Sequence, residues 1–203
     1  MKRAAVWLLR IGNCRGFGIQ SPWAYSLVCD VINEHRPYYA YPSLQRMFPR
    51  ADVVKRRISK LLMRLANHIQ PSAVVAVGFP EEDNKMSEAY TMAGCRRCRY
   101  IRVAEGDNAA ADAVAGGQAG CRPLLLYLNG ADTPSAASAV KLLPMLRNGD
   151  YMLLEGIRAS SEAREAWQRI AGDAPGVQTF DLYYCGLVYA DTDRYKQNYI
   201  INF

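Results

Sequence analysis

VVAVGFPEEDNK, residues 74–85, contains the clearest signal for the class of fold. It opens with a short apolar run, Val-Val-Ala-Val, which is typical of a buried strand. Gly78 follows where the chain must turn, and three consecutive acids then stand where a helix would begin. Acidic side chains favour the first turn of a helix because they complement the positive end of its dipole. The stretch therefore predicts a strand, a glycine turn and a helix start.

This unit repeats along the chain after residue 73. Short apolar segments occur at residues 73–77, 100–104, 123–128 and 151–155. Helical segments are expected between and after them, near residues 82–93, 108–116, 134–147 and 160–171. Strands that alternate with helices indicate the doubly wound α/β class, a mostly parallel sheet with helices on both faces. The chain then ends with TFDLYY, GLVYAD and YIINF and no helix between the first two, which predicts antiparallel strands at one sheet edge.

The first 70 residues predict helices rather than strands. Ser21 followed by Pro22 is typical of a helix start, and Pro37 is expected to end that helix. PYYAYP, residues 37–42, predicts an aromatic connector. A second, basic helix then carries an apolar stripe formed by Ile58, Leu61, Leu62, Leu65 and Ile69. We expect a helical N-terminal extension, residues 1–70, packed on an α/β domain, residues 71–203, as one compact unit.

Four aromatic residues of the extension are expected to be covered by the core or by a partner subunit. They are Trp23, Tyr38, Tyr39 and Tyr41. Together they would otherwise form a large exposed aromatic patch, which soluble monomers rarely carry.

Composition narrows the class of protein. The chain has 203 residues, half of them hydrophobic, and no apolar run approaches the ~20 residues of a membrane span. The basic start, MKRAAVWLLR, lacks a small-residue cleavage site, so we expect a cytoplasmic protein without membrane attachment. Six scattered cysteines indicate reduced thiols. The net charge of +6 is moderate, and the basic stretches lack the interleaved aromatics that would favour a nucleic-acid partner.

Two longer stretches resemble a known family. RGFGIQSPWAYSLVCDVINEHRPYYAY, residues 15–41, is similar to the N-terminal signature of a Bacteroidetes group of class I S-adenosylmethionine-dependent methyltransferases. SSEAREAWQRI, residues 160–170, followed by VQTFDLYYCGLVYA, residues 177–190, resembles the ending of the same group. The resemblance spans nearly the whole chain. It implies a Rossmann-like methyltransferase fold whose last strand pair is an antiparallel hairpin.

The resemblance also implies where a cofactor would bind. The strand ends place Gly78, Glu105, Asn129 and Glu155 around one crevice, with Glu105 toward the ribose hydroxyls. The residues 100–107, YIRVAEGD, align equally with the second and the third strand of the family. Only about twenty residues separate this segment from the next strand, so one strand–helix unit is missing in either alignment.

The cofactor loop itself departs from the family pattern. Ala76 stands where the family has an acid, and no further glycine occurs before Gly94. Glycine matters here because the backbone must approach the ligand closely. Phe79 is bulky, Pro80 removes an N–H donor, and the acids that follow would repel the cofactor carboxylate. We therefore expect S-adenosylmethionine to bind weakly or not at all.

No metal is expected. In metal-dependent O-methyltransferases an aspartate stands where this chain has Asn129, and an amide contributes no charge to a hard cation. Cys95 and Cys98 have ligand spacing but form a single pair, whereas structural zinc takes four ligands. A reactive thiol and an ordinary connector are the alternatives for this pair. His35 and His68 are expected to be surface or packing residues.

Three functions remain open at this stage. The first is a methyltransferase with weakened or lost cofactor binding, and no catalytic residue can be named for it. The second is a non-catalytic member that keeps the fold to bind a small molecule or a protein, with a homodimer as one form of such binding. The third, an RNA-binding accessory protein, is the weakest.

Overall fold

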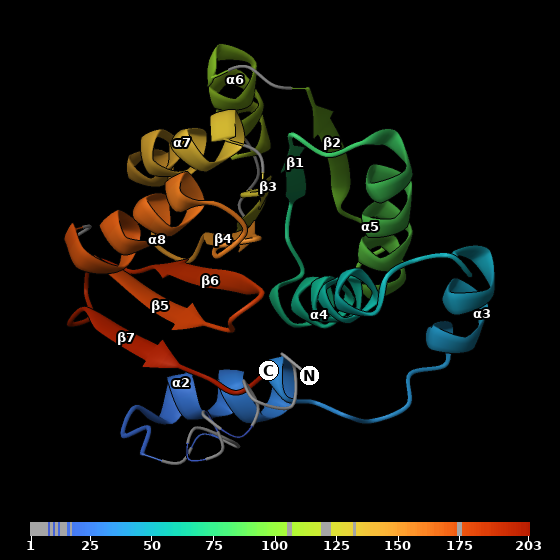
Figure 1. Ribbon diagram of the computed structural model, residues 1–203, viewed down its shortest axis with the longest axis horizontal. Coiled ribbons are helices and arrows are strands. Elements are labelled where there is room, and N and C mark those ends of the chain that lie inside the picture. The colour runs from blue at the N-terminus through green and yellow to red at the C-terminus, as the bar shows by residue number, and fades with distance from the viewer. Residues whose placement is uncertain are drawn as a thin grey trace.

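The centre of the molecule is a seven-stranded sheet whose strand order is β2-β1-β3-β4-β6-β5-β7 (Figure 1). The computed structural model describes residues 8, 10, 12, 16, 18–104, 107–118, 123–131, 133–173 and 176–203. The strands are β1 (Ala73–Val77), β2 (Arg99–Val103), β3 (Leu124–Asn129), β4 (Tyr151–Glu155), β5 (Val177–Asp181), β6 (Cys185–Ala190) and β7 (Gln197–Ile200). The first four are parallel to one another, and β6 runs antiparallel to both β4 and β5. The predicted Rossmann-like α/β fold with an antiparallel hairpin is confirmed.

The helices begin and end close to the positions that the sequence predicts. In the α/β part they are α5 (Glu81–Gly94), α6 (Asp107–Gly117), α7 (Thr133–Leu142) with the 3-10 turn η3 (Leu143–Met145), and α8 (Ser161–Asp173). In the extension they are α2 (Pro22–Leu27), which continues as the π-helical turn η2 (Val28–Ile32), α3 (Ala40–Met47) and α4 (Val53–Ile69).

The last strand corrects one prediction. The segment YIINF was expected to form an antiparallel strand, but β7 runs parallel to its neighbour β5, with Phe180 opposite Tyr199. The chain leaves β6 at the end of the sheet where β5 begins, and β7 starts from that same end. Because β7 starts where β6 ends, it runs against β6 and in the same direction as β5. Its pairing with β5 rather than with β6 therefore makes this strand pair parallel. Only β6 therefore runs against the rest of the sheet.

The position of β2 identifies the missing unit. In the doubly wound order 3-2-1-4-5-6, the second strand lies between the first and the third. Here β2 pairs with β1, and no described strand lies beyond it. The segment is therefore the second strand of such a sheet, and the unit that would follow it at the outer edge is absent from the described residues.

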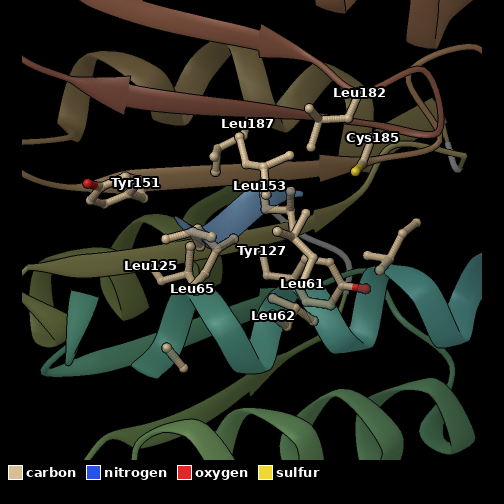
Figure 2. Close-up of a cluster of buried hydrophobic side chains, with 14 of the residues drawn as sticks. Leu61, Leu62, Leu65, Leu125, Tyr127, Tyr151, Leu153, Leu182, Cys185 and Leu187 are labelled. Carbon is tan, nitrogen blue, oxygen red and sulfur yellow. The ribbon is translucent and has the colours of Figure 1, made fainter. Parts of the chain in front are cut away.

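Each face of the sheet is covered by its own set of helices, as alternate strand residues predict. Val74, Ala76, Leu125, Tyr127 and Leu153 pack with α4 and α2 in one core cluster. Figure 2 shows Leu61, Leu62 and Leu65 of α4 pointing toward the strands in this cluster. The intervening residues of the same strands pack on the other face against α6, α7 and α8. A parallel sheet needs this double cover because both of its faces are apolar.

The extension differs from its prediction at the aromatic connector. The first helix ends at Ile32, ahead of Pro37, and α3 already begins at Ala40 inside PYYAYP. Pro42 is accommodated because it lies in the first turn of α3, where its missing N–H is not needed. Tyr38 and Tyr41 pack against the small cluster around Leu44, Met63, Met86 and Tyr90.

The aromatic residues of the extension are only partly covered. The Trp23 ring lies 4.3 Å from the Tyr189 ring and 6.2 Å from the Phe180 ring, so it joins α2 to the C-terminal strands. Tyr39, by contrast, is fully exposed at 104% of its reference area. The core of the chain therefore does not cover Tyr39, and its burial by a partner subunit stays a prediction.

The two C-terminal motifs that carry the family resemblance meet in the core. Gly186 of β6 lies directly under the Trp167 ring of α8, so closely that a Cβ at Gly186 would overlap the ring. The tryptophan is buried, with 6% of its area exposed. One residue of each motif belongs to this pair, and their contact fixes α8 on β6.

The docking of the extension can be tested with a matched pair of aromatic substitutions. We expect Trp23→Ala to lower the free energy of unfolding by about 2 kcal/mol, because it empties the contact with Phe180 and Tyr189. Tyr39→Ala should change it by less than about 0.5 kcal/mol, because the ring is exposed. Urea unfolding followed by circular dichroism measures both, and equal effects would contradict the packing described for α2.

Candidate functional site

Three of the four residues predicted for the crevice lie at the carboxyl ends of neighbouring strands. Gly78 follows β1, Asn129 ends β3, and Glu155 ends β4 directly opposite Asn129 in the register. Glu105, the fourth, lies outside the described residues. The topology thus brings Gly78, Asn129 and Glu155 to the edge of the sheet where ligands bind in open α/β folds.

Hydrogen bonds within the protein engage the backbone of the Gly78 turn. Gly78 has a φ of 76°, a conformation that glycine adopts without strain. Its N–H donates to the carbonyl of Val103 at 3.2 Å, and its carbonyl accepts from the Asn129 Nδ2 amide at 2.9 Å. The Asn129 Oδ1 in turn accepts from the N–H of Ala131 at 3.3 Å. Both polar atoms of the glycine and both ends of the asparagine amide therefore have partners in the protein.

The space beside Gly78 is also occupied. A Cβ added at Gly78 would overlap the Ser135 Oγ and would lie 3.1 Å from the Ser135 Cβ. Ser135 belongs to the first turns of α7 and is buried, with 1% of its area exposed. The glycine thus allows a close approach, but the group that approaches is a side chain of the same chain.

Phe79 and Pro80 close the remainder of the turn. The Phe79 ring stacks on the Tyr127 ring with centroids 4.1 Å apart, and the Phe79 carbonyl accepts from the buried Asn84 Nδ2 at 2.9 Å. Pro80 is the N-cap of α5 and provides neither an N–H nor a side-chain cap. The loop is therefore built as part of the core rather than as an open cradle.

Glu155 lies in a half-buried ionic cluster. Its Oε2 accepts a hydrogen bond from the Tyr127 hydroxyl and lies 2.9 Å from the Lys55 Nζ. The Lys55 Nζ also lies 3.0 Å from Asp83 Oδ2 and 4.5 Å from the centre of the Phe79 ring. Burial raises the pKa of Tyr127 well above its usual range, and the Glu155 carboxylate raises it further. The phenol therefore stays protonated and donates to Glu155.

Lys55 is, with Tyr127, a residue of this cluster that the sequence analysis did not select. It comes from α4, far from the α/β alternation, and only 12% of its side chain is exposed. A signal was present, because Lys55 stands one turn before Ile58 and so extends the apolar stripe of α4 toward the sheet. Ser135 and Tyr127 carry no comparable sequence signal.

The acids at the start of α5 pair largely with basic residues. Glu81 lies 2.9 Å from Arg102 of β2, and Glu82 lies 3.3 Å from Lys85 one turn later. Both are exposed, so these pairs add little stability. Their negative charge is nevertheless located at the N-terminal end of α5, where the carboxylate of a cofactor would have to bind.

The Cys95–Cys98 pair and the two histidines take structural or surface positions. Cys95 and Cys98 are buried in the core cluster under α4, and the Cys98 thiol donates to the Cys95 carbonyl at 3.1 Å. His35 and His68 are exposed. Within the described ranges, no group of three or more His, Cys, Asp or Glu side chains is placed to hold a metal ion, and no helix is long and apolar enough to cross a membrane.

These contacts test whether the crevice fits S-adenosylmethionine. A cofactor loop needs free backbone groups and open space beside its glycine. At Gly78 the N–H, the carbonyl and the space beside the Cα are all taken by Val103, Asn129 and Ser135. A ligand at this turn would therefore have to share or displace contacts that the chain itself makes.

Comparison with known proteins gives structural similarities only. No protein-family model matches the chain, and no curated protein matches it. The O-methyltransferase TomG from Streptomyces achromogenes, solved with S-adenosylmethionine, is 15% identical and has a TM-score of 0.48, over 77% of this chain and 91% of that protein. The S-adenosylhomocysteine-bound methyltransferase PaMTH1 from Podospora anserina is 12% identical with a TM-score of 0.48, over 84% and 97%. An O-methyltransferase from Bacillus cereus, also with S-adenosylhomocysteine, is 10% identical with a TM-score of 0.47, over 83% and 96%.

The closed turn predicts the effect of adding a methyl group at Gly78. Gly78→Ala should lower the free energy of unfolding by about 2 kcal/mol or more, because the residue has a positive φ and the new Cβ meets Ser135. Gly116→Ala is the matched control. It lies in α6 with open space around it, so it should stabilise the protein by about 0.5 to 1 kcal/mol. Thermal unfolding measures both, and a harmless Gly78→Ala would show that the turn is open.

The ionic cluster can be tested by removing its cation. Lys55→Met should cost about 3 kcal/mol, because it leaves Glu155 half-buried without its positive partner. The double variant with Glu155→Gln should recover most of this loss, since no charge is then left unpaired. Asp83→Asn, at a more exposed partner, should cost under about 1 kcal/mol. A double variant as unstable as Lys55→Met alone would contradict the pairing.

Proposed function

We propose that this chain is a methyltransferase-fold protein that binds S-adenosylmethionine weakly or not at all and acts as a non-catalytic binding protein. The observation that carries the proposal is the closed Gly78 turn. Its hydrogen bonds and its open side are used by Val103, Asn129 and Ser135. A ligand could reach the glycine backbone only by displacing contacts that hold β1, β2 and α7 together.

The state of Glu155 supports the same function. An acid at the end of β4 would serve a bound ligand best if its charge were not already paired within the protein. Here Lys55 and Tyr127 both engage the same oxygen of Glu155, and Phe79 packs beside them. The cluster joins α4 to the sheet, which is a structural task. The absence of the edge unit beyond β2 from the described residues removes one wall that an adenosine pocket would use.

A binding role is compatible with the surface outside the crevice. One hollow of about 590 Å³ lies between the α3–α4 connection and the start of α5, and its wall includes Phe48, Lys55 and Met86. Its size is within the range of small-molecule sites. In this proposal the chain binds a small molecule or a protein. A second copy of the chain, in a homodimer, is one such protein partner.

The decisive experiment is cofactor binding by the purified protein. A ligand at 100 times its dissociation constant raises stability by ~2.7 kcal/mol, which a melting curve detects easily. We expect no shift in melting temperature with 1 mM S-adenosylmethionine or S-adenosylhomocysteine, roughly the highest concentration of practical use. Calorimetric titration with the same ligands provides an independent readout. An established S-adenosylmethionine-binding methyltransferase measured in the same buffer is the positive control. Micromolar binding of either ligand would overturn the proposal and make a working methyltransferase the better interpretation.

A further inference from the structure

The positive charge of the chain is concentrated in its N-terminal extension. Residues 1–70 contain 12 Lys and Arg against 3 Asp and Glu, a net of +9. Residues 71–203 contain 13 against 16, a net of −3, so the two parts together give the +6 of the whole chain. An asymmetry of this kind between two parts of one chain points to an anionic ligand or partner on the basic part.

A hollow of about 560 Å³ collects part of this charge. It lies between residues 32–45, which lead from η2 into α3, and one side of α4, with Phe203 at its wall. Four cationic side chains line it, against one acidic side chain among the described residues, that of Glu34. The cations are Arg36, Arg57, Lys60 and Arg64. Its volume is in the range of sites that bind small molecules.

Two of the cations are held at this hollow without a carboxylate partner among the described residues. Arg64 is 6% exposed, and its guanidinium donates to the carbonyls of Val31 at 2.6 Å and Ile32 at 2.9 Å and to the Tyr41 hydroxyl at 3.3 Å. The Lys60 Nζ lies 4.7 Å from the centre of the Tyr41 ring. These neutral partners orient the two charges but do not neutralise them.

The environment of Lys60 shows the effect of this uncompensated charge. Burial lowers the pKa of Lys60, and the positive charges of Arg64 and Arg56 lower it further. The one acid of the hollow, Glu34, is directed to Arg36, whose backbone N–H it accepts at 2.7 Å and whose Nε lies 3.6 Å away. A bound anion would therefore gain contact with Lys60 and Arg64 without displacing an existing ion pair of theirs.

We propose that this hollow, between residues 32–45 and α4, binds a small phosphate ester through Lys60 and the surrounding arginines. Phosphate suits the site because its several oxygens accept from an ammonium and from guanidinium groups at once. The rings of Tyr38 and Tyr41, with centroids 5.2 Å apart, provide an aromatic wall for the rest of the ligand. The proposal goes beyond the function proposed above and does not rest on it, because none of these residues belongs to the crevice at Gly78.

Calorimetric titration of the full chain with pyrophosphate and with adenosine monophosphate tests the site directly. We expect both probes to bind, with an affinity that falls as salt is raised. Lys60→Ala should weaken binding about tenfold, the usual effect of losing one charged hydrogen bond. Arg164→Ala is the control, because it removes the same charge from an exposed position on α8. It should leave the affinity unchanged.

A variant that binds the probes more tightly provides a second test, because a misfolded variant would not gain affinity. Glu34→Gln removes the only acid of the hollow while keeping an oxygen for the Arg36 N–H, so it should tighten binding severalfold. No binding of either probe at millimolar concentration would overturn the proposal, as would equal losses in Lys60→Ala and Arg164→Ala. Binding of a single-stranded oligonucleotide without binding of either small probe would also overturn it, because the basic surface would then serve nucleic acid.

Discussion

The packing of one helix from outside the α/β alternation holds this structure together. A parallel sheet exposes two apolar faces, and each must be covered. Here α6, α7 and α8 cover one face, whereas α4 lies across the middle of the other with Leu61, Leu62 and Leu65 against the strands. Other contacts depend on the position of α4. α5 packs so closely that a Cβ at Gly94 would overlap the carbonyl of Met63, and α3 packs on the cluster that Met63 shares with α5.

The same helix connects two sites of different character. The side of α4 that continues its apolar stripe carries Lys55 into the cluster with Glu155 at the end of the sheet. A neighbouring side carries Lys60 and Arg64 into the hollow next to residues 32–45. The crevice is thus packed as part of the core, while positive charges without a carboxylate partner among the described residues lie at the hollow next to residues 32–45. The Gly78 turn is packed against Ser135 and Asn129, whereas Lys60 and Arg64 contact neutral groups at the hollow.

Local chemistry made much of the fold predictable. Apolar runs located β1 and β4 to the residue, and Ser21 with Pro22 located the start of α2. The prediction was wrong, or stayed open, where distant parts of the chain decide the outcome. The direction of β7 depends on its pairing with β5, and the identity of β2 as the second strand depends on its place beside β1. At the site, the strand ends of Gly78, Asn129 and Glu155 were predictable, because carboxyl ends of parallel strands meet at one edge. Ser135 and Lys55 were not selected, since their contacts with that edge arise only from the packing of α7 and α4.

The position of α2 has a consequence for how the protein is made. Its Trp23 rests on Phe180 and Tyr189, and Arg10 donates to the carbonyls of Asp181 and Ile201, so the two ends of the chain lie side by side. A ribosome adds ~5–20 residues each second, so the partners of Trp23 emerge about 10 to 30 s after it does. During that interval α4 and the first four strands can assemble, whereas the Trp23 side of α2 still lacks Phe180 and Tyr189. The beginning of the chain therefore reaches its final contacts only after the last strands have been made, and until then the Trp23 ring remains uncovered on that side.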